Sequence, residues 1–328
     1  MPRQHLWGVD ALAAAGHVVD IAPFSEPHDR NALDRISSRT RRLLGHLDQE
    51  AYAARRLAAI DVLFCADQNG LAGLALARSL LPAARFISVV HHPVHNAVRR
   101  SASALQDVLV CLSQALSSQL QRDLPRRRAA VVHLPWGPDL SWPLYHSRGE
   151  GNGVVSAGKS NRDLTTLAKA LEISRAPGTV YDLAHELSGP LDAGVRLIGP
   201  GEVAGVDPDA PGQYLAARVL DDIAAASIVA VPIRDPRRLT GLTEVADALA
   251  LGKPVIATRS PYFPFDIEEI GCGVWVEPAD PYGWARAIST LVADAGARTE
   301  MGAAGRRFAE RRWNYERFCE GLCTLISA

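Results

Sequence analysis

Residues 239–280 read LTGLTEVADALALGKPVIATRSPYFPFDIEEIGCGVWVEPAD, and this stretch decides the fold of the chain. A helical pattern at Glu244–Leu251 is followed by two apolar runs, Pro254–Thr258 and Gly273–Val276. Apolar runs without polar alternation, placed between helices, are typical of parallel strands covered on both faces. The stretch therefore predicts an α/β unit whose ligands bind beside the loops at the carboxyl ends of the strands.

The same alternation extends outward from this stretch in both directions. Short apolar runs that read as buried strands lie at Val62–Ala66, Phe86–Val90, Val108–Leu112, Ala129–Leu134, Gly153–Ala157, Val195–Ile198 and Ile228–Ile233. Helical patterns lie between them at Leu71–Leu81, Ser113–Asp123, Leu164–Ile173 and Tyr282–Ala293. Repeated strand and helix units over 328 residues predict an α/β fold of two doubly wound, Rossmann-like domains with parallel sheets.

A segment rich in proline and glycine, residues 135–151, divides the chain. Such punctuation is typical of a connection between domains. We therefore expect a first domain at residues 1–146 and a second domain at residues 147–310. The final residues, 311–328, have the pattern of an amphipathic helix.

The first residues depart from this plan. A helical pattern at Trp7–Ala15 precedes the apolar run Val18–Ala22, which reads as a strand. A doubly wound domain normally opens with a strand and a glycine-rich turn before its first helix. Neither pattern is present here, so we expect that the first strand of the N-terminal domain is missing.

Composition excludes several classes of protein. The chain carries 35 Lys+Arg against 36 Asp+Glu, and 48% of its residues are hydrophobic. This balance disfavours intrinsic disorder and a dedicated nucleic-acid binder. No apolar stretch approaches the ~20 residues that span a bilayer, and no secretory signal pattern opens the sequence. The 5 cysteines form no C-x-x-C pair and indicate reduced thiols. We therefore expect a soluble, cytoplasmic protein.

The two parts of the chain differ in charge. Residues 1–146 hold 16 arginines and 12 acids, a net charge of +4, while the rest holds 19 basic and 24 acidic residues, a net charge of −5. The arginines of the first part cluster at Arg39–Arg42, Arg99–Arg100 and Arg126–Arg128. These clusters are read either as solvated helix faces or as contacts to an anionic acceptor or a membrane surface.

Two glycine-containing loops follow predicted strands of the second domain. Thr240-Gly241-Leu242-Thr243 opens a helix, where free backbone N–H groups and the helix dipole suit a diphosphate, although Thr243 also fits an ordinary N-cap. Lys159 and Arg162 lie in the loop after Gly153–Ala157 and either neutralise that diphosphate or are plain surface charges. In the same loop, Asn161 or Asp163 would cap the next helix.

Asp247 lies one helical turn beyond the threonine-containing loop. A carboxylate there could accept hydrogen bonds from ribose hydroxyls, since carboxylates are acceptors only. The other reading is a solvated acid on a helix face.

Histidines follow a predicted strand of the first domain. His91 and His92 come directly after Phe86–Val90 and are expected to face the ligand side of the sheet, where an imidazole could bond a sugar or a departing phosphate oxygen. The alternatives are a packing role or a metal site that includes His95. We expect no metal, because adjacent histidines on an irregular turn rarely converge on one ion.

Three further residues are candidates for acceptor binding. Asp67 follows Val62–Ala66 at another strand end, where it could meet acceptor hydroxyls or cap the next helix. His5 and Trp7 lie where the missing first turn would bring the chain to the ligand side.

The second half of the chain resembles the C-terminal domain of GT-B glycosyltransferases, and most closely glycosyltransferase family 4. The matching segments occur in the family's order: VVSAGKSNRDLTTLAKAL, RLIGPGE, LDDIAAASIVAVPI, TGLTEVADALALGKPVIAT, GCGVWVEPADPYGWARAI and RTEMGAAGRRFAERRWNYERF. The first domain resembles the family more loosely, through ADQNGLAGLALAR, VVHHPVH, LVCLSQAL and PWGPDL.

The resemblance implies a GT-B fold in which the C-terminal domain binds a nucleotide sugar and the N-terminal domain binds the acceptor. Residues 311–328 would form a helix that crosses back to the N-terminal domain. Members usually retain the anomeric configuration and need no metal or other cofactor. The implied partners are a nucleotide diphosphate sugar and a small-molecule, glycan or lipid-linked acceptor, without nucleic acid.

The resemblance also assigns residues. Lys159 and Arg162 match the basic pair at the donor diphosphate, and Thr240–Thr243 match the loop at the phosphates and sugar. Asp247 matches the second acid of the family's E-x7-E motif, which binds ribose. His91, with His92 close behind, matches a histidine beside the reacting sugar. The first glutamate of E-x7-E is replaced by Leu239, so the motif is degenerate.

These observations predict a glycosyltransferase that moves a sugar from a nucleotide diphosphate sugar to a hydroxyl acceptor. Two alternatives stay open at this point: a nucleotide-sugar epimerase of GT-B fold, and a non-catalytic nucleotide- or sugar-binding relative, which Leu239 and the missing first strand favour. A dinucleotide-dependent oxidoreductase is disfavoured, because no G-x-G-x-x-G lies between a strand and a helix.

Overall fold

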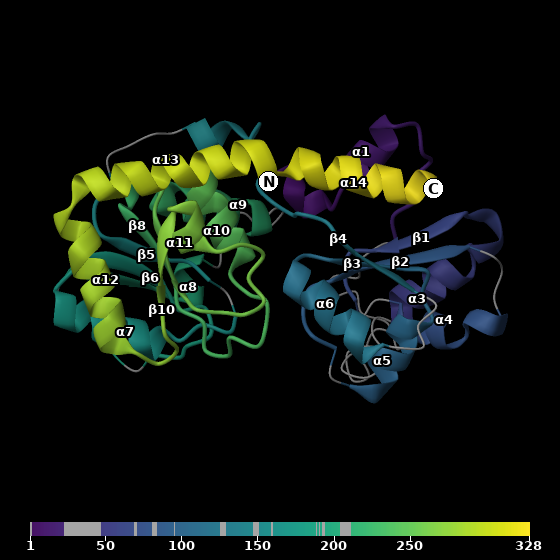
Figure 1. Ribbon diagram of the computed structural model, residues 1–328, viewed down its shortest axis with the longest axis horizontal. Helices are drawn as coiled ribbons and strands as arrows, with labels where there is room; N and C mark the ends of the chain where they lie inside the picture. Colours follow the sequence, from purple (N-terminus) through teal and green to yellow (C-terminus); the bar gives the residue numbers. More distant parts are fainter. Residues whose placement is uncertain are drawn as a thin grey trace. The chain divides into compact units, whose positions relative to one another are not determined.

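The computed structural model of the chain forms two compact units, which we call unit 1 and unit 2 (Figure 1). It describes residues 2–22, 47–68, 71–80, 84–94, 96–124, 129–146, 151–158, 160–187, 189, 191, 194–203 and 211–328. Unit 1 comprises Met1–Leu6 and Trp136–Phe318, and unit 2 comprises Trp7–Pro135 and Cys319–Ala328.

The two units differ in extent from the two predicted domains, and contacts within each unit show why. Residues 1–6 and 136–146 pack within unit 1, because the Arg3 guanidinium pairs with Asp139 and the Trp136 indole N–H donates to the Gln4 carbonyl oxygen at 3.1 Å. Near the C-terminus of the chain, Gly321 lies against Leu134, and the Arg85 guanidinium donates to the Ile326 carbonyl oxygen. Both contacts lie within unit 2. Each unit is therefore discontinuous in sequence.

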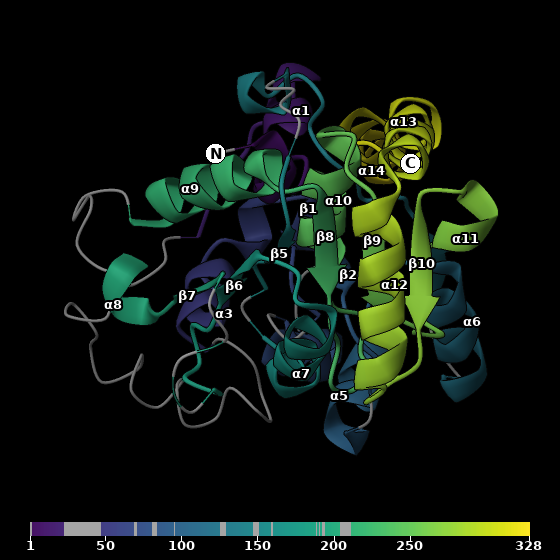
Figure 2. The same ribbon diagram turned by 90° about the vertical axis from the view of Figure 1, so that its left-hand side faces the viewer.

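Unit 1 is built on a six-stranded parallel sheet in the order β10-β9-β8-β5-β6-β7 (Figure 2). The strands are β5 (Val154–Ser156), β6 (Gly178–Tyr181), β7 (Val195–Ile198), β8 (Ile228–Val231), β9 (Val255–Thr258) and β10 (Gly273–Val276). This order is that of a doubly wound fold, with the direction of winding reversed between β5 and β8. The predicted doubly wound architecture is confirmed for this unit.

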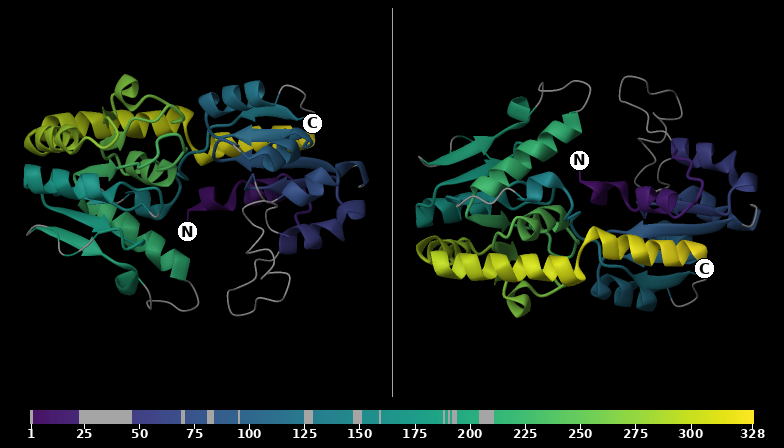
Figure 3. Two further views of the ribbon diagram at one scale, coloured as in Figure 1. Left: turned by 90° about the horizontal axis from the view of Figure 1, so that it is seen from below. Right: turned by 90° about the horizontal axis from the view of Figure 1, so that it is seen from above.

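Helices cover both faces of this sheet. They are α7 (Leu164–Ser174), α8 (Pro200–Val203), α9 (Pro211–Ala225), α10 (Leu242–Ala250), α11 (Ile267–Ile270), α12 (Pro281–Ala293) and α13 (Ala295–Arg312), with 3-10 turns η1 (Arg3–Leu6) and η4 (Pro143–His146). The last helix, α14 (Tyr315–Ser327), begins in unit 1 and belongs to unit 2 from Cys319 onward. The crossovers β5-α7-β6 and β8-α10-β9 run in opposite directions across the sheet, so right-handed connections place α7 and α10 on opposite faces. The views from below and above show α13 beside α10 (Figure 3).

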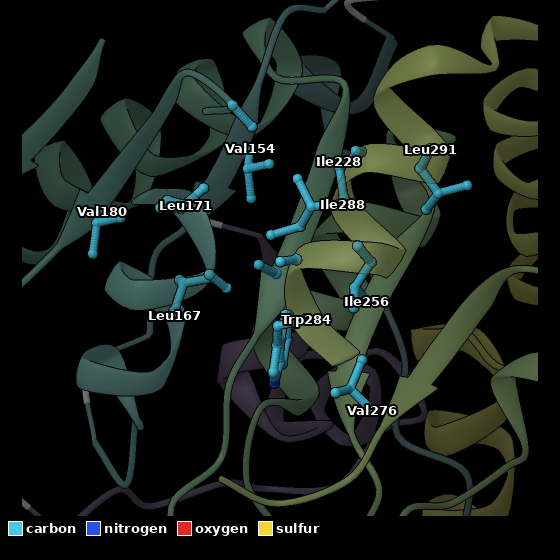
Figure 4. Close-up of a cluster of buried hydrophobic side chains, with 14 of the residues drawn as sticks. Val154, Leu167, Leu171, Val180, Ile228, Ile256, Val276, Trp284, Ile288 and Leu291 are labelled. Atoms are coloured by element: carbon cyan, nitrogen blue, oxygen red, sulfur yellow. The ribbon is translucent and has the colours of Figure 1, made fainter. Parts of the chain in front are cut away.

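The main core of unit 1 lies between α7, α12 and the strands (Figure 4). Leu167 and Leu171 of α7 meet Trp284 and Ile288 of α12 over Ile228 of β8, and all five are buried. Spacings of three and four residues place each helical pair on one face, as the apolar pattern of the sequence predicts.

Three cationic side chains close the C-termini of helices in unit 1. The Lys253 ammonium donates to the Ala224 carbonyl oxygen of α9 at 2.7 Å, the Arg306 guanidinium donates to Ala250 of α10, and the Arg298 guanidinium donates to Leu291 of α12 at 2.5 Å. Terminal carbonyl groups lack partners within the helix and carry the negative end of its dipole. Lys253, whose sequence context gave it no chemical role, is therefore a structural cap.

Unit 2 contains a four-stranded parallel sheet in the order β1-β2-β3-β4. The strands are β1 (Val62–Cys65), β2 (Arg85–Val90), β3 (Val108–Cys111) and β4 (Ala130–His133). Its helices and 3-10 turns are α1 (Val9–Ala14), α3 (Leu47–Ala54), η2 (Leu57–Ala59), α4 (Ala72–Leu76), η3 (Arg78–Leu80), α5 (Ala97–Ala104) and α6 (Gln114–Asp123). Four of the predicted strands of this half, from Val62–Ala66 to Ala129–Leu134, are confirmed within one residue at each end.

Two elements differ from the sequence-based expectations. Val18–Ala22 forms no strand, because nothing pairs with its backbone in the part of the chain that the structure describes. The Val18 side chain is fully exposed. In that part no strand precedes β1. Strand β6 was not predicted, because the Pro177-Gly178 pair at its start reads as a turn, yet Gly178 pairs with Val154 of β5.

Candidate functional site

The loops after β5 and β8 meet at the point where the winding of the sheet of unit 1 reverses. Arg162 forms an antiparallel bridge with Ile233, the Asp163 N–H donates to the Pro232 carbonyl oxygen at 3.1 Å, and the Arg234 N–H donates to the Asn161 carbonyl oxygen at 3.1 Å. In open α/β sheets this reversal point is where ligands bind. The two loops singled out from the sequence are thus brought together.

Asn161 fastens these two loops to each other. Its side-chain amide donates to the Asp235 carbonyl oxygen at 3.0 Å and to the Thr240 hydroxyl oxygen at 3.1 Å, while its carbonyl oxygen accepts from the Asp235 N–H at 3.0 Å. Its φ of 56° lies in the left-handed region, which asparagine tolerates. The cap of α7 is instead Asp163, whose carboxylate accepts from the Thr166 N–H at 3.1 Å.

The N-terminus of α10 is formed by backbone alone. Gly241 is the N-cap with a φ of 86°, and no side chain caps the helix. A Cβ at this position would lie 2.5 Å from Cγ1 of Val231, so only glycine fits. The alternative reading of Thr243 as the N-cap is wrong, because the helix already begins at Leu242 and Thr243 lies exposed in its first turn. The first-turn N–H groups form a positive terminus that suits an anion.

Arg162 is half of a buried ion pair. Its guanidinium pairs with the Glu244 carboxylate in the first turn of α10 and also donates to the Ser160 carbonyl oxygen at 2.7 Å. Both side chains are buried, so the reading of Arg162 as a surface charge is wrong. Gly158 makes this packing possible, because a Cβ there would overlap the guanidinium.

The electrostatics around Arg162 keep it charged. Burial lowers the pKa of Arg162 to about 10, while the nearby Glu186 carboxylate raises it. Glu186 also pairs with the Arg234 guanidinium at 2.7 Å. Lys159, the other member of the predicted basic pair, lies outside the described residues.

Asp247 is a buried acid with a hydroxyl partner. Its side chain is 5% exposed, and its Oδ1 accepts from the Tyr145 hydroxyl at 2.6 Å. Burial raises the pKa of Asp247 to about 7, although the Tyr145 hydrogen bond lowers it. The alternative of a solvated helix acid is therefore wrong. Leu239, at the first position of the degenerate motif, is buried in the same unit and supplies no polar group.

The histidines of unit 2 follow β2, as predicted. The Gln68 side-chain oxygen accepts from the backbone N–H groups of His91 at 2.6 Å and His92 at 2.9 Å, which ties this turn to the end of β1. The His91 Nε2 lies 2.6 Å from the Ala66 carbonyl oxygen. Since a carbonyl only accepts, Nε2 carries the proton and Nδ1 is an acceptor. Burial lowers the pKa of His91, which favours this neutral form.

Two of the predicted acceptor residues lie beside His91. The Trp7 ring packs edge-on to the His91 ring with centroids 4.8 Å apart, and Trp7 has a left-handed φ of 54°. Asp67 lies close enough for its charge to raise the pKa of His91. The capping role considered for Asp67 is filled by Glu50, whose carboxylate accepts from the N–H groups at the start of α4.

The third acceptor candidate, His5, belongs to unit 1. It packs against Trp136 within unit 1, with ring centroids 6.3 Å apart, and burial lowers its pKa. His95 and the arginines at 39–42 and 126–128 lie outside the described residues. Among the residues that are described, no three potential metal ligands cluster. In the same ranges, no helix is both long and apolar enough to cross a membrane.

Two residues of these sites, Glu244 and Tyr145, were missed by sequence reasoning. The sequence placed Gln68 at a strand end next to Asp67, but it did not predict that Gln68 would hold the turn at His91. Glu244 and Tyr145 carried no usable signal, because their partners lie 82 and 102 residues away.

The chain is similar to known glycosyltransferases in sequence and in fold. Residues 211–294, which include α10 and its N-terminal loop, match the family model described as Glycosyl transferases group 1. A D-inositol 3-phosphate glycosyltransferase from Xylanimonas cellulosilytica is 36% identical over 189 residues, which is 57% of this chain and 38% of that protein. The chain thus spans well under half the length of the curated relatives it matches.

Solved structures share the whole fold. Sucrose-phosphate synthase from Thermosynechococcus elongatus superimposes with a TM-score of 0.69 at 16% identity, covering 98% of this chain and 91% of that one. Anabaena Alr3699/HepE in complex with UDP-glucose gives a TM-score of 0.63 at 19% identity, covering 87% and 83%. The resemblance to glycosyltransferases is confirmed, and the chain has the GT-B fold.

Proposed function

We propose that this chain transfers a sugar from a nucleotide diphosphate sugar to a hydroxyl group of an acceptor, with retention of the anomeric configuration. One observation carries the proposal most directly. The Arg162 loop and the uncapped N-terminus of α10 meet at the reversal point of the sheet of unit 1, within a unit that matches a glycosyltransferase family model. This arrangement offers a cation and backbone N–H donors to a diphosphate.

The donor side of the proposed reaction is electrostatic. As the bond between sugar and diphosphate breaks, negative charge grows on the departing phosphate oxygen. Fixed donors that are already oriented stabilise that charge without reorganisation. The Arg162 guanidinium and the N–H groups of Leu242 and Thr243 are such donors, and Asn161 holds Thr240 in place beside them. Asp247 is assigned to the ribose.

The acceptor side of the proposed reaction uses a neutral imidazole, an aromatic ring and one carboxylate. The His91 Nδ1, an acceptor in the tautomer that the Ala66 carbonyl selects, can take a hydrogen bond from a substrate hydroxyl. The Trp7 ring beside it provides an apolar face for a sugar or polyol ring. We assign acceptor binding to unit 2 through Trp7 and Asp67, and we assign no metal or resident cofactor.

The names of similar proteins suggest the first substrates to test. UDP-glucose is bound in the Alr3699/HepE structure, and the sequence relatives are named for D-inositol 3-phosphate. We take UDP-glucose as the first donor and D-inositol 3-phosphate as the first acceptor. The five free thiols fit the reducing cytoplasm as the place of action.

A thermal-shift screen over nucleotide diphosphate sugars tests donor binding, because a ligand that binds only the folded state raises the unfolding temperature. We expect one of these sugars to raise the midpoint of the wild type. The double variant Arg162→Ala/Glu244→Ala, which leaves no unpaired charge, should lose most of the shift. The exposed Arg286→Ala on α12 should keep it.

Two outcomes would overturn the assignment of the donor site. One is the absence of a shift with every nucleotide diphosphate sugar, and the other is a full shift in the double variant. For the reaction itself, release of UDP from UDP-glucose should require the acceptor. Conversion of the free nucleotide sugar without any acceptor would contradict transfer.

A further inference from the structure

Asp247, the acid predicted to bind the ribose, lies at one end of a buried chain of hydrogen bonds in unit 1. Gln4, Tyr145 and Asp247 are 0%, 1% and 5% exposed. The Gln4 amide donates to the Tyr145 hydroxyl oxygen at 3.0 Å, and that hydroxyl donates to Asp247 Oδ1 at 2.6 Å. The chain joins η1, η4 and α10, which are far apart in sequence.

The direction of this chain is fixed at its start. The Asp139 N–H, which can only donate, lies 2.8 Å from Gln4 Oε1. The Gln4 Nε2 must therefore face Tyr145, and it also can only donate. The Tyr145 oxygen accepts that bond, so its own proton is left for Asp247. Arg3 holds Asp139 from the other side through two guanidinium contacts at 3.1 and 3.0 Å.

The two oxygens of the Asp247 carboxylate are thereby made unequal. Oδ1 is held by Tyr145, whereas within the described part of unit 1 no hydrogen bond engages Oδ2. An aspartate reaches one methylene less far than the glutamate that the resemblance places here. A partner that fixes the short side chain is therefore needed to hold it in one position.

We propose that Tyr145, held by Gln4, is a positioning residue that orients Asp247 toward the ribose hydroxyls of the donor. This inference rests on the proposed function. Tyr145 supplies a hydrogen bond to the ionised carboxylate, and Asp247 presents Oδ2 to the ligand. The segment 136–146 thus contributes to donor recognition from outside the matched stretch 211–294.

The test compares two ligands on three proteins. UDP and 2′,3′-dideoxy-UDP differ only in the ribose hydroxyls, so the ratio of their dissociation constants reports the ribose contact alone. Wild type should prefer UDP by about tenfold, since hydrogen bonds to a charged group are worth that much. Tyr145→Phe should lower the ratio to nearly one, and Asp247→Asn should do the same.

A matched control separates positioning from folding. Tyr181→Phe removes the hydroxyl of another buried tyrosine of unit 1, which donates to Asp222 at 2.5 Å, and it should leave the ratio unchanged. The pH profile gives a second readout. The UDP affinity of the wild type should fall as pH drops through about 7, where Asp247 takes up its proton, and Tyr145→Phe should move that fall to higher pH.

The outcomes are distinct. UDP binding to the wild type together with an unchanged ratio in Tyr145→Phe would overturn the positioning role and leave the proposed function standing. A ratio of one in the wild type would remove Asp247 from the ribose site and overturn this inference as well. Absence of UDP and GDP binding would contradict the donor assignment from which the inference starts.

Discussion

The key side chains at the ligand edges of the two units are held by different kinds of partner. In unit 1, Arg162 is paired with Glu244 and lies close to Glu186, so charged groups line the loops after the strands. In unit 2, His91 is held by two neutral partners, the Ala66 carbonyl and the Gln68 amide, and the Asp67 carboxylate lies close to its ring. A diphosphate requires charge to replace its hydration, whereas a hydroxyl acceptor requires an oriented lone pair. The difference fits a donor unit and an acceptor unit.

The sharpest way to break this comparison is to remove one charge from unit 1. Arg162→Ala should lower the free energy of unfolding by about 3–5 kcal/mol, because Glu244 is left buried without its partner. Arg162→Ala/Glu244→Ala should recover most of this loss. Urea denaturation measures both variants, with Arg286→Ala as the exposed control. Equal stability of the single variant and the wild type would show that the pair contributes nothing.

The buried acid of unit 2 should give the next largest effect. Burial raises the pKa of Glu50 to about 7, against the opposing backbone hydrogen bonds of Leu74 and Gly73. The unfolded value is about 4.3, so the folded state binds the proton more tightly and stability falls as pH rises between these values. Over that window, the free energy of unfolding should drop by roughly 3 kcal/mol.

Glu50→Gln should flatten this pH dependence, and the exposed Glu172→Gln should leave it as in the wild type. Chemical denaturation at pH 5, 6, 7 and 8 provides the measurement. A stability that rises across the window in the wild type and not in Glu50→Gln would show that the carboxylate is preferred in the folded state, contrary to this account.

Replacing His91 tests the ligand edge of unit 2 directly. His91→Ala should reduce the rate of sugar transfer about 100-fold, because a substrate hydroxyl loses the imidazole nitrogen that accepts its hydrogen bond. The dissociation constant of UDP should stay within twofold of the wild-type value, since the proposed diphosphate contacts lie in unit 1. Steady-state kinetics and titration calorimetry separate the two quantities. Unchanged turnover would remove His91 from the mechanism.

A smaller change is expected at Trp7. Trp7→Ala should raise the KM for the acceptor about fivefold, since the ring face beside His91 is lost. Trp7→Phe retains an aromatic face and should restore part of the affinity. An increase in the KM for the donor, with the KM for the acceptor unchanged, would show that Trp7 does not bind the acceptor.

The smallest effect concerns metal. Treatment with EDTA should leave the rate of transfer unchanged, because in the proposed reaction Arg162 and the α10 terminus supply the charge that a metal would otherwise bring. The assay compares the treated enzyme with and without added Mg²⁺ or Mn²⁺. Loss of activity that either ion restores would contradict a metal-free mechanism.

The successes and failures of the sequence analysis have one physical explanation. Apolar periodicity is local, so β8, β9 and β10 could be placed from the sequence within three residues at each end. The start of α10 was misplaced because Thr243 is a good cap by composition, whereas contact with Val231 makes Gly241 the N-cap. Strand β6 was missed because Pro177-Gly178 favours a turn locally, and pairing with β5 overrides that preference.

The candidate sites show the same division. The positions of Arg162 and His91 after strands, and of Asp247 on the helix after the threonine-containing loop, could be predicted, because they follow from the order of the elements. Their states could not be predicted. The reading of Arg162 as a surface charge and of Asp247 as a solvated acid both failed, because burial depends on chain segments that the local pattern does not contain.

The sequence by itself determined the doubly wound units and the loops at the ends of their strands, since hydrophobic periodicity and glycine placement act over a few residues. Only the tertiary structure decided which groups those loops meet. The reversal between β5 and β8 brings Arg162 to Glu244, and the packing of residues 1–6 and 136–146 within unit 1 brings Gln4 and Tyr145 to Asp247. Such partners are fixed by where strands lie in the sheet, which no local stretch of sequence encodes.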